Sequence, residues 1–255
     1  MTVIQILASG SIVLITHLVQ TVTGFGSTVL ALPFLSQIIS LKAAIPTLAI
    51  LSWILSLYIV CLHWRRIVFR QYLIILAFVS IGLPFGIIIF RIFQASFLQK
   101  ALAIFIIIIS IKNLIEVKII KFKNSHRTKI LINNFSVVKR WSLYALLILG
   151  GVIHGAFASG GPLIVLYTAS AIKDFGSFRS TLSLLWITFN TILILNYFIS
   201  SSFTVQNFRD TAILIPFLFL GIWIGDAAHN YFSKFNVKPI ISAVLGMTGI
   251  IMLVS

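Results

Sequence analysis

Apolar runs, most of them about as long as a bilayer is thick, fill nearly the whole chain. Its 255 residues are 60% hydrophobic and only 9% charged, and about 20 apolar residues suffice for a helix to cross hydrocarbon. Inside a membrane the backbone must satisfy its own hydrogen bonds, which favours helices. The runs therefore predict one all-α polytopic membrane protein. They are Val3–Thr23, Val29–Ile39, Ala43–Leu62, Gln71–Phe90, Phe97–Glu116, Trp141–Phe157, Pro162–Ile172, Ser180–Ile199, Thr211–His229 and Pro239–Val254.

Positive residues are concentrated between these runs. The chain has 19 Lys and Arg against four Asp and Glu, a net charge of +15. In a soluble chain this balance would indicate nucleic-acid binding, but between membrane spans positive residues set the topology. We therefore expect a lipid bilayer as the partner, and no nucleic acid.

One apolar segment is interrupted by glycine and proline. Gly160 and Gly161 weaken a helix, and Pro162 is favourable only where a new helix begins, because it has no N–H and clashes with a preceding turn. We predict one helix ending near Ala158 and a second beginning at Pro162. Within hydrocarbon such a break is tolerated only where the freed polar groups are buried in protein or face a cavity. The break is therefore a candidate site.

The second half of the chain repeats the first. An upstream offset of 134 residues places the Gly26-Ser27-Thr28 segment on Gly160-Gly161-Pro162. Both halves thus carry a glycine break at the same place, as in a repeat architecture. An offset of 139 residues pairs Tyr58 with Tyr197, Phe69 and Arg70 with Phe208 and Arg209, Gly82 and Gly86 with Gly221 and Gly225, and Phe93 with Phe232.

These repeats predict three parts: a first repeat at 1–116, a basic cytoplasmic linker at 117–140 and a second repeat at 141–255. Each repeat has one broken helix pair and three further transmembrane helices. If the second repeat is inverted, the positive residues left outside are Lys42, Arg91, Lys100 and Arg209, whereas parallel repeats divide the charges more evenly. Inverted repeats with discontinuous helices are typical of secondary transporters.

The glycine patterns resemble those of the TauE/SafE family. They are Gly24-Phe25-Gly26 followed by an apolar run to Pro33, the second copy from Gly155 to Leu166, and the spacing of Gly82, Gly86, Gly221 and Gly225. The resemblance covers essentially the whole chain outside the linker. It implies a multi-pass permease of the bacterial inner membrane that moves sulfite, sulfonates or related organic anions. Ser27-Thr28 and Ala158-Ser159 depart from the family pattern, so the resemblance does not specify the substrate.

A helix that begins inside a membrane presents unpaired N–H groups and the positive end of its dipole, which suits an oxyanion. Both breaks supply such an end, and hydroxyl groups beside them add donors. The alternative is that the glycines only allow close helix packing. The residues we expect to bind the anion are Gly24, Gly26, Ser27, Thr28, Ser159, Gly160, Gly161 and Asn190.

Each of the other polar residues in the apolar runs has a functional and a structural interpretation. His154, the counterpart of Gln20, could carry a proton in coupled transport or bond a carbonyl group. Asp226 is a second candidate for proton coupling, although a local pair with His229 is the simpler reading. Arg179 could attract anions, but arginines near helix ends usually reach lipid head groups. The sequence leaves open protons as coupling ion and a homodimer as the assembly.

Two other classes compete with the carrier. Ser159 within a membrane helix, with His229 as base, resembles the arrangement of an intramembrane serine protease, but the repeat explains the glycines without a nucleophile. A passive channel or a membrane scaffold could share the fold. The single cysteine, Cys61, excludes a cysteine cluster for a metal, and the few acids argue against a cation path lined by carboxylates. We expect no metal, no cofactor and no enzymatic step. We predict a carrier that exposes an anion site alternately to the two sides.

Overall fold

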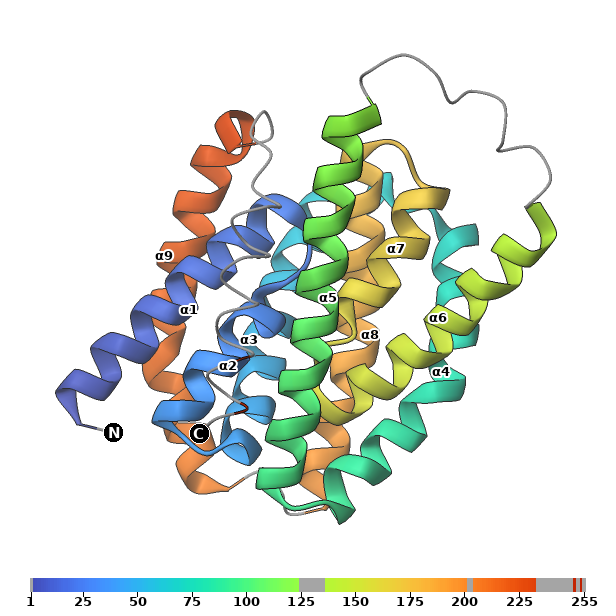
Figure 1. Cartoon of the computed structure of the whole chain (residues 1–255). Helices are drawn as coiled ribbons and strands as arrows, with labels where there is room; N and C mark the ends of the chain where they lie inside the picture. The colour runs from blue at the N-terminus through green and yellow to red at the C-terminus, as the bar shows by residue number, and fades with distance from the viewer. Residues whose placement is uncertain (1, 124–135, 201–203, 233–249, 251–252, 254–255) are drawn as a thin grey trace.

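The computed structural model describes residues 2–123, 136–200, 204–232, 250 and 253 (Figure 1). The described part is all helical, without strands. The last predicted run, Pro239–Val254, lies outside the described residues apart from positions 250 and 253. The helices are α1 (Val3–Thr23), α2 (Ser27–Ile38), α3 (Leu41–His63), the 3-10 turn η1 (Trp64–Arg66), α4 (Phe69–Ile92), α5 (Ala95–Lys123), α6 (Ser136–Phe157), α7 (Gly161–Ala171), α8 (Phe175–Ile199) and α9 (Val205–Phe232).

Five segments of the described chain are long and apolar enough to cross a membrane. The short helices α2 and α7 have 12 and 11 residues, about half of what a crossing needs. Each follows a longer helix after a sharp break, so the predicted break before Pro162 is confirmed, as is its counterpart after Thr23. The crossing segments are Val3–Thr23, Leu41–Arg66, Phe69–Ile92, Phe175–Ile199 and Val205–Ala227.

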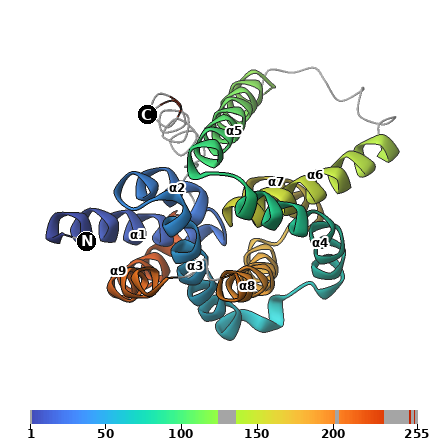
Figure 2. The same ribbon diagram turned by 90° about the horizontal axis from the view of Figure 1, so that it is seen from below.

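Helices from the two halves pair with each other. The most extensive contacts join α4 to α6, α1 to α9 and α3 to α8, and the view along the bundle shows these neighbours (Figure 2). The first arm of each broken pair, α1 or α6, therefore packs against the fourth helix of the other half. The two central helices, α3 and α8, lie between these outer pairs (Figure 2).

Glycines allow both outer pairs to approach closely. A Cβ on Gly86 of α4 would lie 2.8 Å from the backbone nitrogen of Ala156 in α6. In the other pair, a Cβ on Gly225 of α9 would lie 2.7 Å from Cβ of Thr21 in α1. Small residues at such crossings bring helix backbones together in membranes. The repeated glycine spacing in the sequence is therefore a packing pattern as well as a mark of the repeat.

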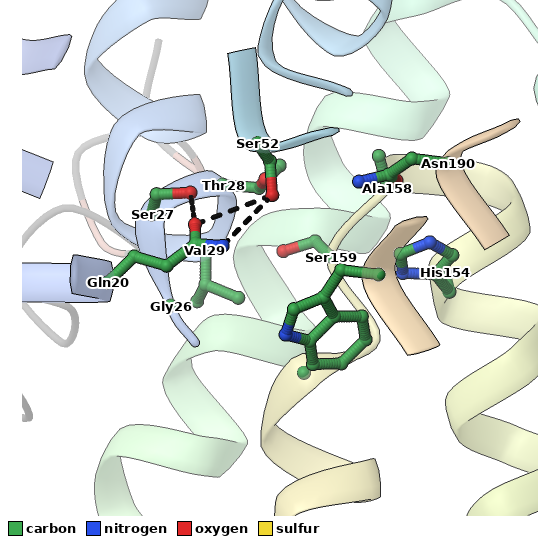
Figure 3. Close-up of a pocket in the computed structure, with 12 residues that line it drawn as sticks. Gln20, Gly26, Ser27, Thr28, Val29, Ser52, His154, Ala158, Ser159 and Asn190 are labelled. Carbon is green, nitrogen blue, oxygen red and sulfur yellow. Dashed lines mark hydrogen bonds between the residues drawn. The ribbon is translucent and has the colours of Figure 1, made fainter. Parts of the chain in front are cut away.

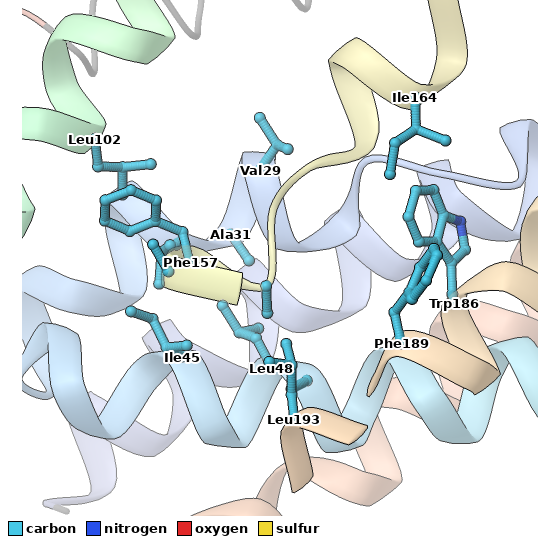
Figure 4. Close-up of a cluster of buried hydrophobic side chains, with 14 of the residues drawn as sticks. Val29, Ala31, Ile45, Leu48, Leu102, Phe157, Ile164, Trp186, Phe189 and Leu193 are labelled. Atoms are coloured by element: carbon cyan, nitrogen blue, oxygen red, sulfur yellow. The ribbon is translucent and has the colours of Figure 1, made fainter. Parts of the chain in front are cut away.

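The buried core surrounds the second break. Phe157, the last residue of α6, lies near Ile45 and Leu48 of α3, and Phe189 and Leu193 of α8 are part of the same cluster (Figure 4). Through residues of the two central helices, α3 and α8, this apolar cluster packs against the broken ends. The breaks are thus held within the protein rather than exposed to lipid, as backbone freed inside a membrane requires.

Polar contacts define the two ends of the bundle. At one end, the side chain of Arg66 after α3 lies against Gly176 at the start of α8. At the other end, Nδ2 of Asn207 at the start of α9 donates to the carbonyl of Ala43 at the start of α3, 3.1 Å away. The α3–α4 connection therefore shares an end with the α7–α8 connection.

The range predicted as the linker, 117–140, is partly helical. Helix α5 continues to Lys123 and α6 begins at Ser136, so both extend into that range. The intervening residues 124–135 lie outside the described residues.

Candidate functional site

The two breaks use the same turn. Gly24 follows α1 with φ of 83°, and its N–H donates to the carbonyl of Gln20 at 2.7 Å. Ala158 follows α6 with φ of 50°, and its N–H donates to the carbonyl of His154, also at 2.7 Å. Left-handed backbone is common for glycine and uncommon for alanine. The offset of 134 residues found in the sequence therefore corresponds to a shared backbone geometry where the first helix ends, whereas the residue before the second helix differs, with φ of 103° at Gly26 and −68° at Gly160.

Each turn leads into a helix whose first N–H groups are free of side-chain caps. In α2 the first helical bond runs from the N–H of Leu30 to the carbonyl of Gly26 at 3.0 Å. In α7 the equivalent bond runs from Ile164 to Gly160 at 3.3 Å. Among the described residues, no side chain forms an N-cap hydrogen bond at the start of either helix. The N–H groups of the first turn, before these bonds begin, and the positive end of each helix dipole are therefore available to a ligand.

A buried cavity lies between these two helix starts (Figure 3). The space between its lining residues, the part open to solvent included, is about 270 Å³. None of the residues that line it, all within the described part of the chain, is Lys, Arg, Asp or Glu. They are Gln20, Gly26, Ser27, Thr28, Val29, Ser52, His154, Ala158, Ser159, Gly161, Trp186 and Asn190.

The structure brings most of the predicted residues together at this cavity. Gly26, Ser27, Thr28, Ser159, Gly161, Asn190 and His154 line it. Gly24 and Gly160 do not line it, but both are tightly packed. A Cβ on Gly160 would lie 2.8 Å from that of His154, and one on Gly24 would lie 2.9 Å from Cα of Arg179.

The first flank of the cavity is a closed hydrogen-bond network around Gln20. The hydroxyl of Ser27 donates to Oε1 of Gln20. Nε2 of Gln20 donates to the hydroxyl of Ser52 at 3.2 Å and approaches that of Ser56 at 3.5 Å (Figure 3). This network links α1, α2 and α3, and it orients the Ser27 proton toward Gln20 rather than toward a ligand.

The second flank has polar atoms without partners. Both ring nitrogens of His154, the hydroxyl of Ser159 and Oδ1 of Asn190 are buried and have no hydrogen bond among the described residues. The His154 ring stacks on Trp186, with centroids 5.6 Å apart, and Asn190 is its polar neighbour. Buried polar groups are nearly always bonded to protein, water or ligand. This flank therefore offers donors and acceptors to a bound molecule.

Three lining residues with polar side-chain atoms, Gln20, Trp186 and Ser52, were not predicted from the sequence to belong to the site. Gln20 was noticed in the sequence only as the counterpart of His154, and its spacing of one turn before the break was the available signal. Trp186 lies in an apolar run, where tryptophan side chains usually pack, yet its Nε1 donates to the carbonyl of Gly24 at 2.9 Å and holds α8 against the first break. Ser52 carried no signal, because a lone serine in an apolar helix is common.

Asp226 is not part of the cavity. Its Oδ1 lies 3.3 Å from Nη2 of Arg179, and the hydroxyl of Tyr58 donates to its Oδ2. The expected neighbour, His229, has its side chain outside the described residues. Arg179 is only 5% exposed, so the expectation that it reaches lipid head groups is wrong. The ion pair with Asp226 of α9, the next helix along the chain, holds it inside the protein.

The geometry lends little support to a protease. The hydroxyl of Ser159 has no hydrogen-bond partner among the described residues, so no base is seen to activate it. The described residues also hold no cluster of three His, Cys, Asp or Glu side chains suited to a metal ion.

The model of the family described as "Sulfite exporter TauE/SafE" matches residues 10–252. The chain belongs to the TauE/SafE family. Comparison with curated proteins gives no match, and neither does comparison with solved structures. The TauE/SafE match confirms the resemblance seen in the glycine patterns. With its long apolar helices, this TauE/SafE protein is a membrane transporter of the sulfite-exporter type.

Proposed function

We propose that this TauE/SafE protein is a secondary transporter of sulfite, a sulfonate or a related small organic anion in a bacterial inner membrane. The anion binds in the cavity between the two broken helices, which is exposed alternately to either side. The observation that carries this proposal is the meeting of two helix N-termini, without side-chain caps, at one buried cavity.

The chemistry of the cavity suits an anion that must also leave. Each helix start carries roughly half a positive charge together with free N–H donors. The described lining has no carboxylate to repel an anion and no Lys or Arg to hold it permanently. Passage requires binding strong enough for entry and weak enough for release. Helix dipoles and neutral donors such as the Ser159 hydroxyl meet both needs.

The cavity lies near the middle of the bundle. Ser52 is close to the midpoint of α3 (Leu41–His63), and Asn190 is near that of α8 (Phe175–Ile199). In transporters built from repeats, the substrate site lies near the bilayer midplane at the repeat interface. This position supports a transport site rather than a surface site.

Contacts at the bundle ends support the inverted arrangement of 1–116 and 141–255. Arg66 lies beside Gly176 at one end, whereas Lys42 and Asn207 belong to the other end. Parallel repeats would put the α3–α4 and α7–α8 connections at opposite ends. The shared end of these two connections favours inversion, and its basic residues assign it to the inside.

If transport is proton-coupled, His154 is the candidate carrier of the proton. It is the titratable side chain among the described lining residues. Asp226 lies away from the cavity in an ion pair with Arg179, so a proton on it would act indirectly.

Uptake into proteoliposomes tests the proposal. Radiolabelled sulfite, a taurine-type sulfonate and short carboxylates are offered with and without an imposed pH gradient. We expect saturable, gradient-dependent flux of one of these anions, which a passive channel or a scaffold would not give. Absence of flux for every anion under both gradients would contradict the proposal.

A matched pair of glycine variants tests the site itself. Gly160→Leu forces a side chain against the Gly150 carbonyl and Cβ of His154, so flux should be lost. Thermal unfolding in detergent checks that the variant folds. Gly10→Leu is the control and should keep its flux, because its Cβ would crowd the side chain of Phe217, away from the cavity lining. Equal flux in both variants would place the anion path elsewhere.

A further inference from the structure

Near the cavity lies a partly buried cluster of charged and polar side chains. Tyr58 of α3, Arg179 of α8 and Asp226 of α9 meet there, and both Tyr58 and Arg179 donate to the Asp226 carboxylate. The Arg179 side chain is 6% exposed and that of Asp226 is 31% exposed. The carboxylate thus sits at the border between the interior and the outer surface of the bundle.

An ion pair inside a protein is by itself weak evidence for a role in stability. Replacing a buried pair by well-packed apolar residues is often neutral or stabilising. Ionisable residues within membrane segments usually mark ion or substrate pathways. The cluster therefore calls for a functional explanation.

The ion pair uses only part of the Arg179 guanidinium. Nη2 of Arg179 contacts Oδ1 of Asp226, whereas Nε is buried without a partner among the described residues. Arginine has a planar fork of donors that matches two oxygens of an oxyanion. The free Nε therefore leaves room for a second acceptor beside the carboxylate.

Arg179 is linked directly to the cavity. Its backbone packs against Gly24, the residue that ends α1 at the first break. Two turns further along α8, Trp186 hydrogen-bonds the Gly24 carbonyl and lines the cavity. Residues at this spacing lie on one face of a helix. The same face of α8 thus runs from the ion pair to the cavity.

We propose that Arg179 is a second anion site, between the cavity and the end of the bundle that carries Arg66. Asp226 occupies this site when no anion is present. An incoming sulfite or sulfonate binds the Nε and Nη2 side of the guanidinium and displaces the carboxylate, which stays bonded to Tyr58. The inference rests on the proposed transport function. It adds to the path of the anion a step in which the anion binds a charged side chain.

Competition between the anion and Asp226 for the Arg179 guanidinium explains how the anion is released. A buried arginine alone would bind an oxyanion too tightly for release, since hydrogen bonds to charged groups are strong. A carboxylate that returns to the guanidinium weakens anion binding and drives the anion onward. Removing the carboxylate should therefore tighten binding and slow turnover.

The test is the concentration dependence of flux in proteoliposomes for the anion that wild type transports. For Asp226→Asn we expect KM and maximal rate both to fall by roughly tenfold, the effect of one interaction of about 1.4 kcal/mol. For Arg179→Lys, which keeps the charge but loses the fork, KM should rise by about tenfold. Arg91→Lys is the matched control, because Arg91 is exposed and bonds Asn196 away from the cavity. Its KM should not change.

Folding is checked by thermal unfolding in detergent. If a single variant leaves an unpaired buried charge and fails to fold, the double variant Arg179→Gln with Asp226→Asn removes both charges. Its KM should rise. Folded variants with wild-type KM and maximal rate would overturn the second site while leaving the proposed transport intact. No saturable flux in wild type would instead overturn the proposed function, and this inference with it.

Discussion

The residues around the cavity divide into a bonded flank and a free flank. Ser27, Gln20 and Ser52 bond one another, so their polar atoms are largely satisfied within the protein. Ser159 and His154 on the other flank have no such bonds among the described residues. A buried polar group without a partner costs about 1–3 kcal/mol. A bound anion would recover part of that energy from the free flank.

Ser159→Ala should therefore impair transport more than Ser27→Ala. Loss of one free hydroxyl donor, at about 1 kcal/mol, raises KM for the anion by roughly fivefold. Ser27→Ala removes a donor that is already committed to Gln20, so a smaller change in KM is expected. Initial rates of uptake over a range of anion concentrations measure both. A larger effect of Ser27→Ala would mean that Ser27 turns its hydroxyl to the anion.

Gly24→Ala should destabilise the protein more than Gly26→Ala. Both glycines have positive φ, 83° and 103°, which an L side chain rarely adopts. Only Gly24 is also crowded, since its Cβ would lie 2.9 Å from Cα of Arg179, whereas nothing lies within 4 Å of a Cβ on Gly26. Thermal unfolding in detergent compares the variants. Equal melting temperatures would show that contact with Arg179 adds nothing.

At the scale of helices, local sequence signals predicted where most helices lie in the chain, but not which helices contact each other. The bounds of α1 follow from an apolar run that ends at the Gly24 break, and the start of α7 follows from Gly160, Gly161 and Pro162. The pairing of Arg179 with Asp226 joins α8 to α9 across 47 positions. No local pattern encodes such a contact. The position of the cavity could likewise be predicted from the two breaks, but the part of Ser52 and Trp186 in its lining could not.

The glycine faces of α4 and α6 lead to a prediction about packing. Gly86→Leu would drive a side chain into the backbone of Ala156, so α4 and α6 must separate. We expect a loss of about 1–3 kcal/mol or more in stability, the usual cost of overpacking. Ala77→Leu on the exposed face of α4 is the control and should leave the melting temperature nearly unchanged. Similar melting temperatures for both variants would contradict close packing at Gly86.

At the scale of the whole molecule, charge and contacts agree on which connections share an end. Arg66 beside Gly176 and Asn207 beside Ala43 define the ends in the structure. By the positive-inside rule, we expect the Arg66 end to face the cytoplasm. The proposed inversion of the repeats follows from this agreement, which the charges alone could only favour.

Cysteine labelling in intact cells tests this orientation. In a Cys61→Ala background, Arg209→Cys should react with a membrane-impermeant thiol reagent added outside. Lys173→Cys should react only after the membrane is permeabilised, because its connection lies at the Arg66 end. Labelling of both positions from the same side would contradict the inverted arrangement.

The most direct measurement of the central claim is protection of a cysteine placed in the cavity. Ser159→Cys in the Cys61→Ala background is treated with neutral methyl methanethiosulfonate, with and without ethanesulfonate, an anion that leaves the reagent intact. The native Cys61 of the unaltered protein is exposed and serves as the control. We predict that the anion slows labelling of Ser159→Cys severalfold and leaves Cys61 unaffected. Equal labelling rates with and without the anion, in protein that transports it, would show that the anion does not bind between the broken helices.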